Sequence, residues 1–381
     1  MTSPAWLLNP HAAAALDTEP TRAPLSYHRK LPGYEPSPLL DAPACAARLG
    51  LRRVWVKDES RRLGLPSFKI LGASWGVYRA LEQRFGELGP WRTAADLAAR
   101  LEGHRPLGLA AATDGNHGRA VARMARLLGL EARIFVPAGT ARARIDAIVG
   151  EGARCEVVDG TYDDAVARSA QEAGERCLVI SDTSWPGYAD VPRWVIEGYS
   201  TIFIEIDEQL ARRDAPAPEV VLIQVGVGAL AAAAARHLRG ADADDAPFLI
   251  GVEPTTAACV KASIEAGKPV QVPGPYGSIM AGLNCGTPSI VAWPAVSAGF
   301  DAFVAIDDGW ARAGMRMLAS EGIEAGETGA AGVGALVALL SDGSDARPAL
   351  HLDGSATALV LCTEGATDPE AYARIVSPRP V

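Results

Sequence analysis

Residues 107–129, LGLAAATDGNHGRAVARMARLLG, combine an apolar strand, a glycine-containing turn and a helix in one short stretch. The run 107–113 is apolar almost throughout, which is typical of a strand buried on both faces of a sheet. Asp114 and Gly115 follow it, and a helix is predicted to run from there through Gly129. A strand that passes through a tight turn into a helix is the repeating unit of a parallel sheet covered by helices.

The same alternation of strands and helices continues along the chain. Further apolar strands are predicted at 132–136, 155–158, 177–180, 220–223, 248–252, 303–306 and 358–361. The rhythm breaks at 182–192, so we predict two α/β domains, each with a mainly parallel sheet flanked by helices. The larger domain is predicted to comprise residues 1–75 and 201–381, and the smaller one residues 76–200. Within the former, the proline-rich and weakly periodic residues 1–36 favour an arm.

The composition is that of an ordinary globular enzyme. The 381 residues are 49% hydrophobic and 21% charged, and the net charge of -9 argues against a nucleic-acid or anionic-membrane partner. The six cysteines show neither CxxC nor metal-ligand spacing, so no metal site is predicted, and a pairing of Cys259 with Cys285 is left open. We see no signal peptide and no uncharged apolar run of about 18 residues, which favours a cytoplasmic protein.

Lys69 is the first candidate functional residue. The chain has only five lysines against 31 arginines, yet Lys69 follows Ser67 and Phe68 at the start of an apolar helix predicted over 69–85. Lysine, unlike arginine, can act as a neutral amine nucleophile when desolvation lowers its pKa, and the usual product is a Schiff base. Lys69 is therefore a candidate for carrying an aldehyde cofactor. The alternative is a lysine whose ammonium group reaches solvent from a helix start.

A glycine-containing loop after the strand 220–223 is a candidate phosphate site. Glycines let backbone N–H groups approach an anion at a helix start. The loop residues are Gly226, Val227, Gly228, Ala229 and Leu230.

The same loop also fits a dinucleotide fingerprint, with Glu253 at the end of the next strand as the acid that would bind a ribose. A nicotinamide enzyme would leave Lys69 and the loop 113–118 without a common purpose, whereas a phosphorylated aldehyde uses all of them. A tight turn without any ligand is the third interpretation.

Pyridoxal phosphate needs an amine, a phosphate cradle, a partner for its ring nitrogen and groups that flank the ring. Cys362 and Thr363 follow the last strand and are the candidates for the ring nitrogen. A neutral hydroxyl or thiol there would favour elimination reactions. Asn116 can donate an amide hydrogen to the phenolate oxygen of the ring.

Asp114 can be interpreted in two ways. It lies between a strand and a helix, so it is either an N-cap or an acid and base on the cofactor face opposite Lys69. His117 is predicted to be a structural residue of the helix start. The candidates for contact with the substrate are Thr113, Asp114, Gly115, His117 and Asp182.

With these residues in hand, the chain resembles the fold-type II (tryptophan synthase β-like) pyridoxal phosphate enzymes, and among them the diaminopropionate ammonia-lyases. The matching segments occur in the same order from about residue 55 to the end. They are 56–60, 68–72, 113–119, 182–188, 226–229, 279–286, 326–330 and 363–368. The aspartate in front of Gly-Asn-His is the specific feature, because many relatives of this fold type carry a serine there.

The resemblance implies a cofactor in the cleft between two α/β domains and the larger domain as the cofactor-binding one. It implies α,β-elimination of ammonia from 2,3-diaminopropionate, giving pyruvate and ammonia. Lys69, with Phe68 beside it, would bind pyridoxal 5'-phosphate and remove the α-proton of the L isomer, and Asp114 that of the D isomer. A homodimer is also implied.

Two other classes of function stay open at this point. One is another fold-type II elimination or β-replacement, such as a serine, threonine or hydroxyaspartate dehydratase or a synthase. The second is an amino-acid-binding protein that retains the fold without catalysis. A test for bound cofactor distinguishes the non-catalytic binding protein, and the reaction products distinguish the other fold-type II enzymes.

Overall fold

The computed structural model describes residues 1–13, 15–16, 21–240, 246–341 and 346–377. The chain divides into two compact units, and each is built from separate segments of the sequence. The larger unit comprises Met1–Pro20, Pro36–Arg61 and Ile202–Val381. The smaller unit comprises Thr21–Glu35 and Arg62–Thr201.

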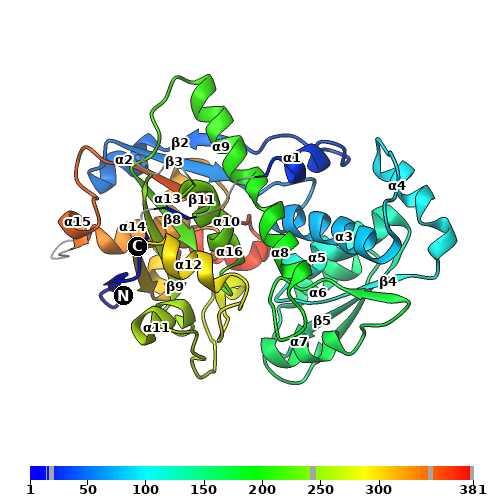
Figure 1. Cartoon of the computed structure of the whole chain (residues 1–381). Coiled ribbons are helices and arrows are strands. Elements are labelled where there is room, and N and C mark those ends of the chain that lie inside the picture. Colours follow the sequence, from blue (N-terminus) through cyan, green and yellow to red (C-terminus); the bar gives the residue numbers. More distant parts are fainter. Residues whose placement is uncertain (14, 17–20, 241–245, 342–345, 378–381) are drawn as a thin grey trace. The chain divides into compact units, whose positions relative to one another are not determined.

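The larger unit contains a seven-stranded sheet enclosed by helices (Figure 1). Its strand order is β1 (Ala5–Leu8), β10 (Ala302–Ile306), β9 (Phe248–Pro254), β8 (Val220–Gln224), β11 (Thr357–Cys362), β3 (Arg53–Asp58) and β2 (Leu39–Asp41). The five inner strands are parallel, and β1 and β2 are antiparallel at the two edges. The inner strands are apolar in sequence because helices cover both of their faces.

The helices of the larger unit fall into two groups. One face of the sheet forms a core with α2, α13 and α14, whereas the buried alanines of α10 lie outside that core and α10 packs against β8 and α12. The bounds are α2 (Pro43–Leu49), α9 (Ser200–Arg212), α10 (Ala229–Leu238), α11 (Cys259–Ala266), α12 (Trp293–Gly299), α13 (Asp308–Ser320), α14 (Ala331–Leu339), α15 (Ala346–Ala349), α16 (Pro369–Val376) and the 3₁₀ turn η3 (Ala281–Leu283).

The smaller unit contains a four-stranded parallel sheet. Its strand order is β6 (Arg154–Val158), β5 (Glu131–Pro137), β4 (Gly108–Ala112) and β7 (Cys177–Val179). The helices are α1 (Ala23–His28), α3 (Lys69–Phe85), α4 (Ala94–Arg100), α5 (Asn116–Leu128), α6 (Arg142–Val149), α7 (Tyr162–Ala170), α8 (Asp190–Gly198) and the 3₁₀ turn η1 (Glu102–His104). Both units are thus strand-and-helix layers, which confirms the predicted fold class.

Helices α5 and α7 cover opposite faces of the smaller sheet. Ala165 of α7 lies in one cluster with Phe135 of β5. On α5, a Cβ atom at Gly118 would lie 2.5 Å from the side chain of Ile134. Since neighbouring residues of a strand point to opposite faces, the two helices lie on different sides of β5.

A buried ion pair ties the end of β3 to α9 in the larger unit. Lys57 Nζ donates hydrogen bonds to Glu205 Oε2 at 2.8 Å, to the Ser37 carbonyl at 2.8 Å and to Gln209 Oε1 at 3.1 Å. The side chains of Lys57 and Glu205 are almost completely buried. These partners satisfy the lysine inside the protein, so the contacts give this residue of the 56–60 segment a structural role.

Two differences from the sequence-based expectations concern chain segments. Residues 1–36 were expected to form an arm, but they contain β1 and α1, and β1 pairs with β10 through backbone hydrogen bonds. The predicted division after residue 75 falls inside α3, and the compact units place 21–35 and 62–75 with the smaller sheet. A helix of that length is one rigid element, so a boundary inside it is not favoured.

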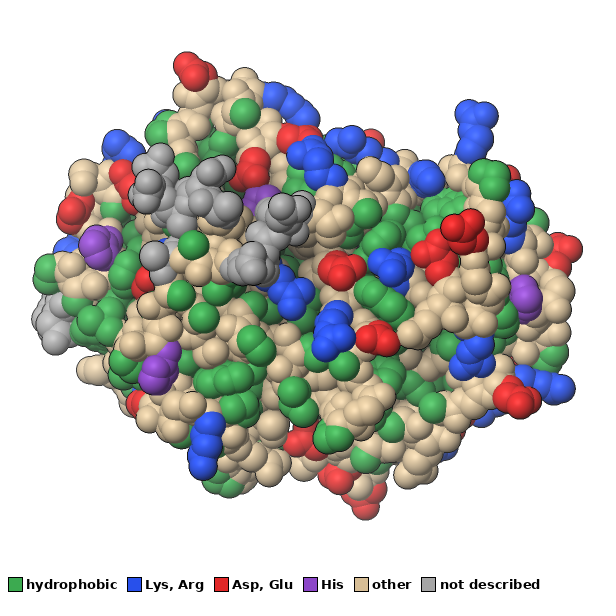
Figure 2. Space-filling view, in the orientation of Figure 1, with side chains coloured by type: hydrophobic (Ala, Val, Ile, Leu, Met, Phe, Trp, Pro, Cys, Tyr) green, Lys and Arg blue, Asp and Glu red, His purple; other side chains and the backbone are tan. Residues whose placement is uncertain are grey.

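Charged side chains of both signs are interspersed over the face of the molecule seen in Figure 2. Among the described residues, no helix combines the length and the apolar character that crossing a bilayer requires.

Candidate functional site

Lys69 and Asp182 form a close ion pair in the smaller unit. Lys69 is the first residue of α3, and its Nζ donates a hydrogen bond to Asp182 Oδ2 at 2.7 Å. The carboxylate belongs to the loop that follows β7, and its side chain is only 6% exposed. Two candidates that lie 113 residues apart are therefore brought together.

The charge state of this pair follows from its surroundings. Burial by itself would lower the pKa of Lys69, but the negative charges of Asp182 and Asp114 outweigh it, and the pKa is raised. Burial likewise opposes ionisation of Asp182, yet Lys69 and His117 hold the pKa of Asp182 well below its usual range. In the chain by itself, Lys69 is therefore a protonated ammonium group and not the neutral amine that desolvation alone would give.

His117 supports the same loop from α5. Its Nε2 lies 2.8 Å from the carbonyl oxygen of Ile180, so Nε2 carries the hydrogen and donates it. Its Nδ1 lies 4.0 Å from Asp182 Oδ2 and has no hydrogen-bond partner among the described residues. Burial lowers the pKa of His117. These contacts agree with the structural role predicted for this histidine.

Asp114 is not the N-cap of the following helix. The N-cap of α5 is Gly115, and no side chain accepts a hydrogen bond there. Thr113 Oγ1 instead accepts the N–H of Gly115 at 2.8 Å, which closes the turn. Gly115 has φ of 150°, a conformation that favours glycine. The turn leaves the half-buried Asp114 close enough for its charge to raise the pKa of Lys69.

Close packing fixes the start of α3, with Tyr199 beneath it. A Cβ atom at Gly72 would lie 2.5 Å from the Tyr199 ring, and the Phe68 ring centroid is 4.7 Å from that of Tyr199. The hydroxyl of Tyr199 is buried and has no hydrogen-bond partner among the described residues. Sequence reasoning missed this residue. The pair of small and aromatic residues at 198–199 was its only local signal.

In the larger unit, the glycine loop connects β8 to α10 as predicted. Gly228, with φ of 99°, is the N-cap of α10, and no side chain caps the helix. The N–H groups of Ala229 and Leu230 in the first turn are therefore donors without an intrahelical acceptor. A Cβ atom at Gly226 would lie 3.0 Å from the Gly282 carbonyl oxygen. The loop thus has the small residues and the free donors that bind a phosphate.

Glu253 does not have the free carboxylate that a dinucleotide site would need. It is fully buried, and its two oxygens accept the N–H groups of Val260 and Lys261 at 2.8 Å each. Because both oxygens are used at the start of α11, they are not available to a ribose hydroxyl. The structure therefore disfavours the nicotinamide alternative.

The two candidates at the end of β11 differ in their partners. Cys362 Sγ donates to the Glu364 carbonyl oxygen at 3.4 Å, and burial raises the pKa of this thiol. Thr363 Oγ1 is buried and has no partner among the described residues. An orphaned hydroxyl at this position fits a ligand atom, such as the ring nitrogen of pyridoxal phosphate.

Strands β8 and β11 are neighbours, so the glycine loop and Thr363 follow adjacent strand ends. Gln224, the last residue of β8, donates from Nε2 to the carbonyl oxygens of Leu361, Thr328 and Gly329. Sequence analysis did not single out Gln224, whose side chain orders the segments around the loop. The loop, the free hydroxyl and Lys69 are the groups that the cofactor needs, and the residues present fit it.

Cys259 and Cys285 both lie beside Gly226. Cys259 Sγ is 3.9 Å from the Gly226 carbonyl oxygen, and Cys285 Sγ would be 3.3 Å from a Cβ atom at Gly226. Both thiols are free in the structure. The two residues named as a conceivable pair therefore pack around the loop as reduced cysteines.

Comparisons with known proteins agree with this assignment. The family model described as "Pyridoxal-phosphate dependent enzyme" matches residues 30–364. The diaminopropionate ammonia-lyase of Salmonella typhimurium (strain LT2) is 38% identical over 92% of this chain and 90% of its own length. The enzyme of the same name from Escherichia coli (strain K12) is 36% identical over 92% of this chain and 89% of its length.

A solved structure gives the same result in three dimensions. The crystal structure of diaminopropionate ammonia lyase from Escherichia coli in complex with D-serine superposes with a TM-score of 0.90 at 34% identity. It covers 98% of this chain and 96% of that chain. By sequence, fold and fitting residues, this chain belongs to the family of pyridoxal-phosphate-dependent enzymes, as a homologue of the diaminopropionate ammonia-lyases.

Proposed function

We propose that the protein eliminates ammonia from 2,3-diaminopropionate and forms pyruvate and ammonia. The observation that carries the proposal is a second carboxylate beside that of Asp182: the turn closed by Thr113 and Gly115 leaves Asp114 outside the N-cap of α5, in the same unit as the Lys69–Asp182 pair. The relatives named diaminopropionate ammonia-lyase, which align over nearly the whole chain, support the choice of substrate.

Several of the residues described above would hold the cofactor. Lys69 Nζ would bind the aldehyde, and the N–H groups of 226–230 the phosphate. The Thr363 hydroxyl, with Cys362 beside it, would bind the ring nitrogen. Asn116 would donate to the ring oxygen, and Phe68 would pack next to the amine. When bound, pyridoxal phosphate supplies an electron sink for the α-carbon of the substrate.

The side chains of the chain would move the protons. Lys69 Nζ would remove the α-proton of the L isomer, and an oxygen of Asp114 that of the D isomer from the opposite face. The C–N bond at the β-carbon then breaks, and whichever residue lies on the other side would protonate the leaving amine. One water is consumed overall, and two ammonia and one pyruvate are released.

Other residues would position these groups. Asp182 would hold the Lys69 ammonium until its proton is needed, and His117 keeps the Asp182 loop in place through Ile180. Thr113 and Gly115 shape the turn that presents Asp114 and would contact the substrate beside it. We propose Thr113, Asp114, Gly115, His117 and Asp182 as the substrate-binding residues.

A product assay over D- and L-isomers of β-substituted amino acids tests the proposal. We expect two ammonia for each pyruvate from diaminopropionate, and no turnover by Lys69→Ala. One ammonia for each keto acid, from serine, threonine or hydroxyaspartate as the preferred substrate, would assign a dehydratase instead. A protein without a visible absorbance band after addition of the cofactor would contradict both. A homodimer in the cytoplasm stays a prediction, tested by light scattering and cell fractionation.

A further inference from the structure

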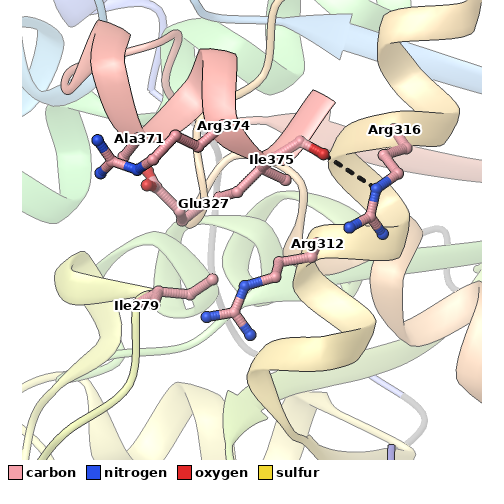
Figure 3. A pocket seen from close by; sticks show the side chains of 7 residues that line it. All are labelled: Ile279, Arg312, Arg316, Glu327, Ala371, Arg374 and Ile375. Carbon is pink, nitrogen blue, oxygen red and sulfur yellow. Dashed lines mark hydrogen bonds between the residues drawn. The ribbon is translucent and has the colours of Figure 1, made fainter. Parts of the chain in front are cut away.

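A pocket of about 350 Å³ lies in the larger unit, and none of its lining residues is proposed above for the cofactor or the substrate. Figure 3 shows three arginines and one glutamate around it. Arg312 and Arg316 come from α13, and Arg374 comes from α16. The remaining lining residues are Ile279, Glu327, Ala371 and Ile375.

The guanidinium groups are largely unpaired. Arg312 makes no hydrogen bond or ion pair with the part of the chain that the structure describes. Arg316 donates from Nε to the Ile375 carbonyl oxygen at 3.0 Å, which orients the group and leaves its terminal nitrogens available. Arg374 is 3.9 Å from Glu370, and both side chains are exposed, so this pair is weak. Arg312 and Arg316 are four residues apart and share one face of α13.

Among the residues that the structure describes, Glu327 is the only acid that lines the pocket, and its carboxylate is also available. The residue is only 6% exposed, and no hydrogen bond to its side chain joins it to another described residue. Its backbone is held on both sides, because Gly326 N–H donates to the Glu364 carbonyl oxygen and Thr328 N–H donates to Glu364 Oε1. A fixed, buried carboxylate without a partner is costly unless a cation binds it.

From these groups we infer that the pocket binds a small amino acid with two carboxylates. Its carboxylates would accept hydrogen bonds from the arginines, which recognise planar anions well. Its ammonium group would donate to Glu327. The short aliphatic part would lie against Ile279 and Ile375. The arginines complement the two carboxylates and Glu327 complements the ammonium group, whereas phosphate or a simple dicarboxylate would leave Glu327 unpaired.

Calorimetric titration of the holoenzyme with L-aspartate and L-glutamate tests this inference. The protein is first reduced with borohydride, which locks the cofactor on Lys69 and prevents uptake of an amino acid there. We expect Arg312→Gln to weaken binding at least about tenfold, as for the loss of one charge-assisted hydrogen bond. Arg142→Gln removes an arginine that is 83% exposed on α6, and should leave binding unchanged.

Succinate supplies the second arm, because it has the two carboxylates without the ammonium group. It should bind the reduced protein more weakly than L-aspartate, and Glu327→Gln should remove the difference. The inference is overturned if neither amino acid binds, if Arg312→Gln binds as well as the unchanged protein, or if succinate equals L-aspartate before any substitution. Because binding is measured on reduced protein, the result does not depend on the lyase activity.

Discussion

The 2.7 Å contact between Lys69 Nζ and Asp182 Oδ2 determines the charge of the amine that would carry the cofactor. A buried carboxylate at that distance favours the ammonium form more than burial disfavours it. The amine must therefore lose a proton before it can attack an aldehyde. The pair keeps Lys69 in place at the cost of its reactivity at neutral pH.

Asp182→Asn should lower the pKa of Lys69, because the largest favourable charge is removed while burial remains. The unloaded protein incorporates pyridoxal phosphate faster when a larger fraction of Lys69 is the neutral amine. The pH at which this rate increases should therefore be lower in the variant. Absorbance of the lysine-bound cofactor, followed across pH, measures this. Asp146→Asn, at a half-exposed position of α6, is the control. Superimposable profiles for Asp182→Asn and the unchanged protein would refute the assignment.

Asp114→Asn should affect the D isomer of diaminopropionate more than the L isomer. The amide cannot accept the α-proton, and loss of a general base typically costs about 10²–10⁴-fold in rate. The measurement is kcat/KM for pyruvate formation from each isomer. An equal loss for the two isomers would show that Asp114 and Lys69 do not serve opposite faces.

Thr363→Val separates cofactor binding from folding. The hydroxyl has no partner among the described residues, so replacing it with a methyl group should leave the unloaded protein as stable as before, or more stable by up to about 1 kcal/mol. The affinity for pyridoxal phosphate should fall about fivefold to tenfold, as one hydrogen bond is lost. Chemical denaturation and cofactor titration are the two measurements. Thr255→Val, at an exposed position, should change neither, and a loss of stability in Thr363→Val would mean that the hydroxyl has a protein partner.

Gly198→Ala should destabilise the protein by about 1–3 kcal/mol, the usual cost of forcing an extra methyl group into a packed contact. The added Cβ would lie 2.6 Å from the Leu71 carbonyl oxygen and 2.8 Å from Gly72 Cα, so α3 and α8 would have to separate. Gly103→Ala has no atom within 4 Å of the new Cβ and should cost little. Denaturation midpoints of the two variants give the comparison, and equal midpoints would contradict the packing argument.

Lys57→Met should cost about 3–5 kcal/mol of unfolding free energy, because it removes the cation of a buried ion pair and keeps the anion. The double change Lys57→Met with Glu205→Leu should recover most of that loss, since both charges of the pair are then removed together. Urea denaturation of the single and double variants measures the difference. If the double variant is less stable than Lys57→Met, hydrogen bonding rather than charge burial accounts for the cost.

Local sequence patterns predicted those helices, strands and loops that are determined by the spacing of nearby apolar residues and glycines. The helix over 69–85 was predicted with the bounds of α3, and the apolar runs correspond to inner strands of the larger sheet and to all four strands of the smaller one. The glycine loop also lies between a strand and a helix, as its spacing indicated. The strand β1 was missed because four residues carry too little periodicity, and its pairing with β10 comes from a segment about 300 residues away.

The partners within the site could not be predicted in the same way. Nothing near Asp182 in the sequence indicates that it faces Lys69, because the contact joins residues 113 positions apart. Only the structure shows that Asp114 is not the N-cap of α5 and that both oxygens of Glu253 accept backbone N–H groups. The segment 326–330, which contains Glu327, was recognised as a motif. The sequence did not indicate that Glu327 lines a pocket with arginines of α13 and α16.

The position of β11 limits when the protein can fold during synthesis. This strand ends at Cys362, yet it lies between β8 and β3 inside the larger sheet. The strands of residues 39–58 must therefore wait for this central neighbour until residue 362 has been made. The smaller sheet, in contrast, is complete once residue 201 has been made. The nascent chain would thus carry one assembled unit while the central position of the other sheet is still unfilled.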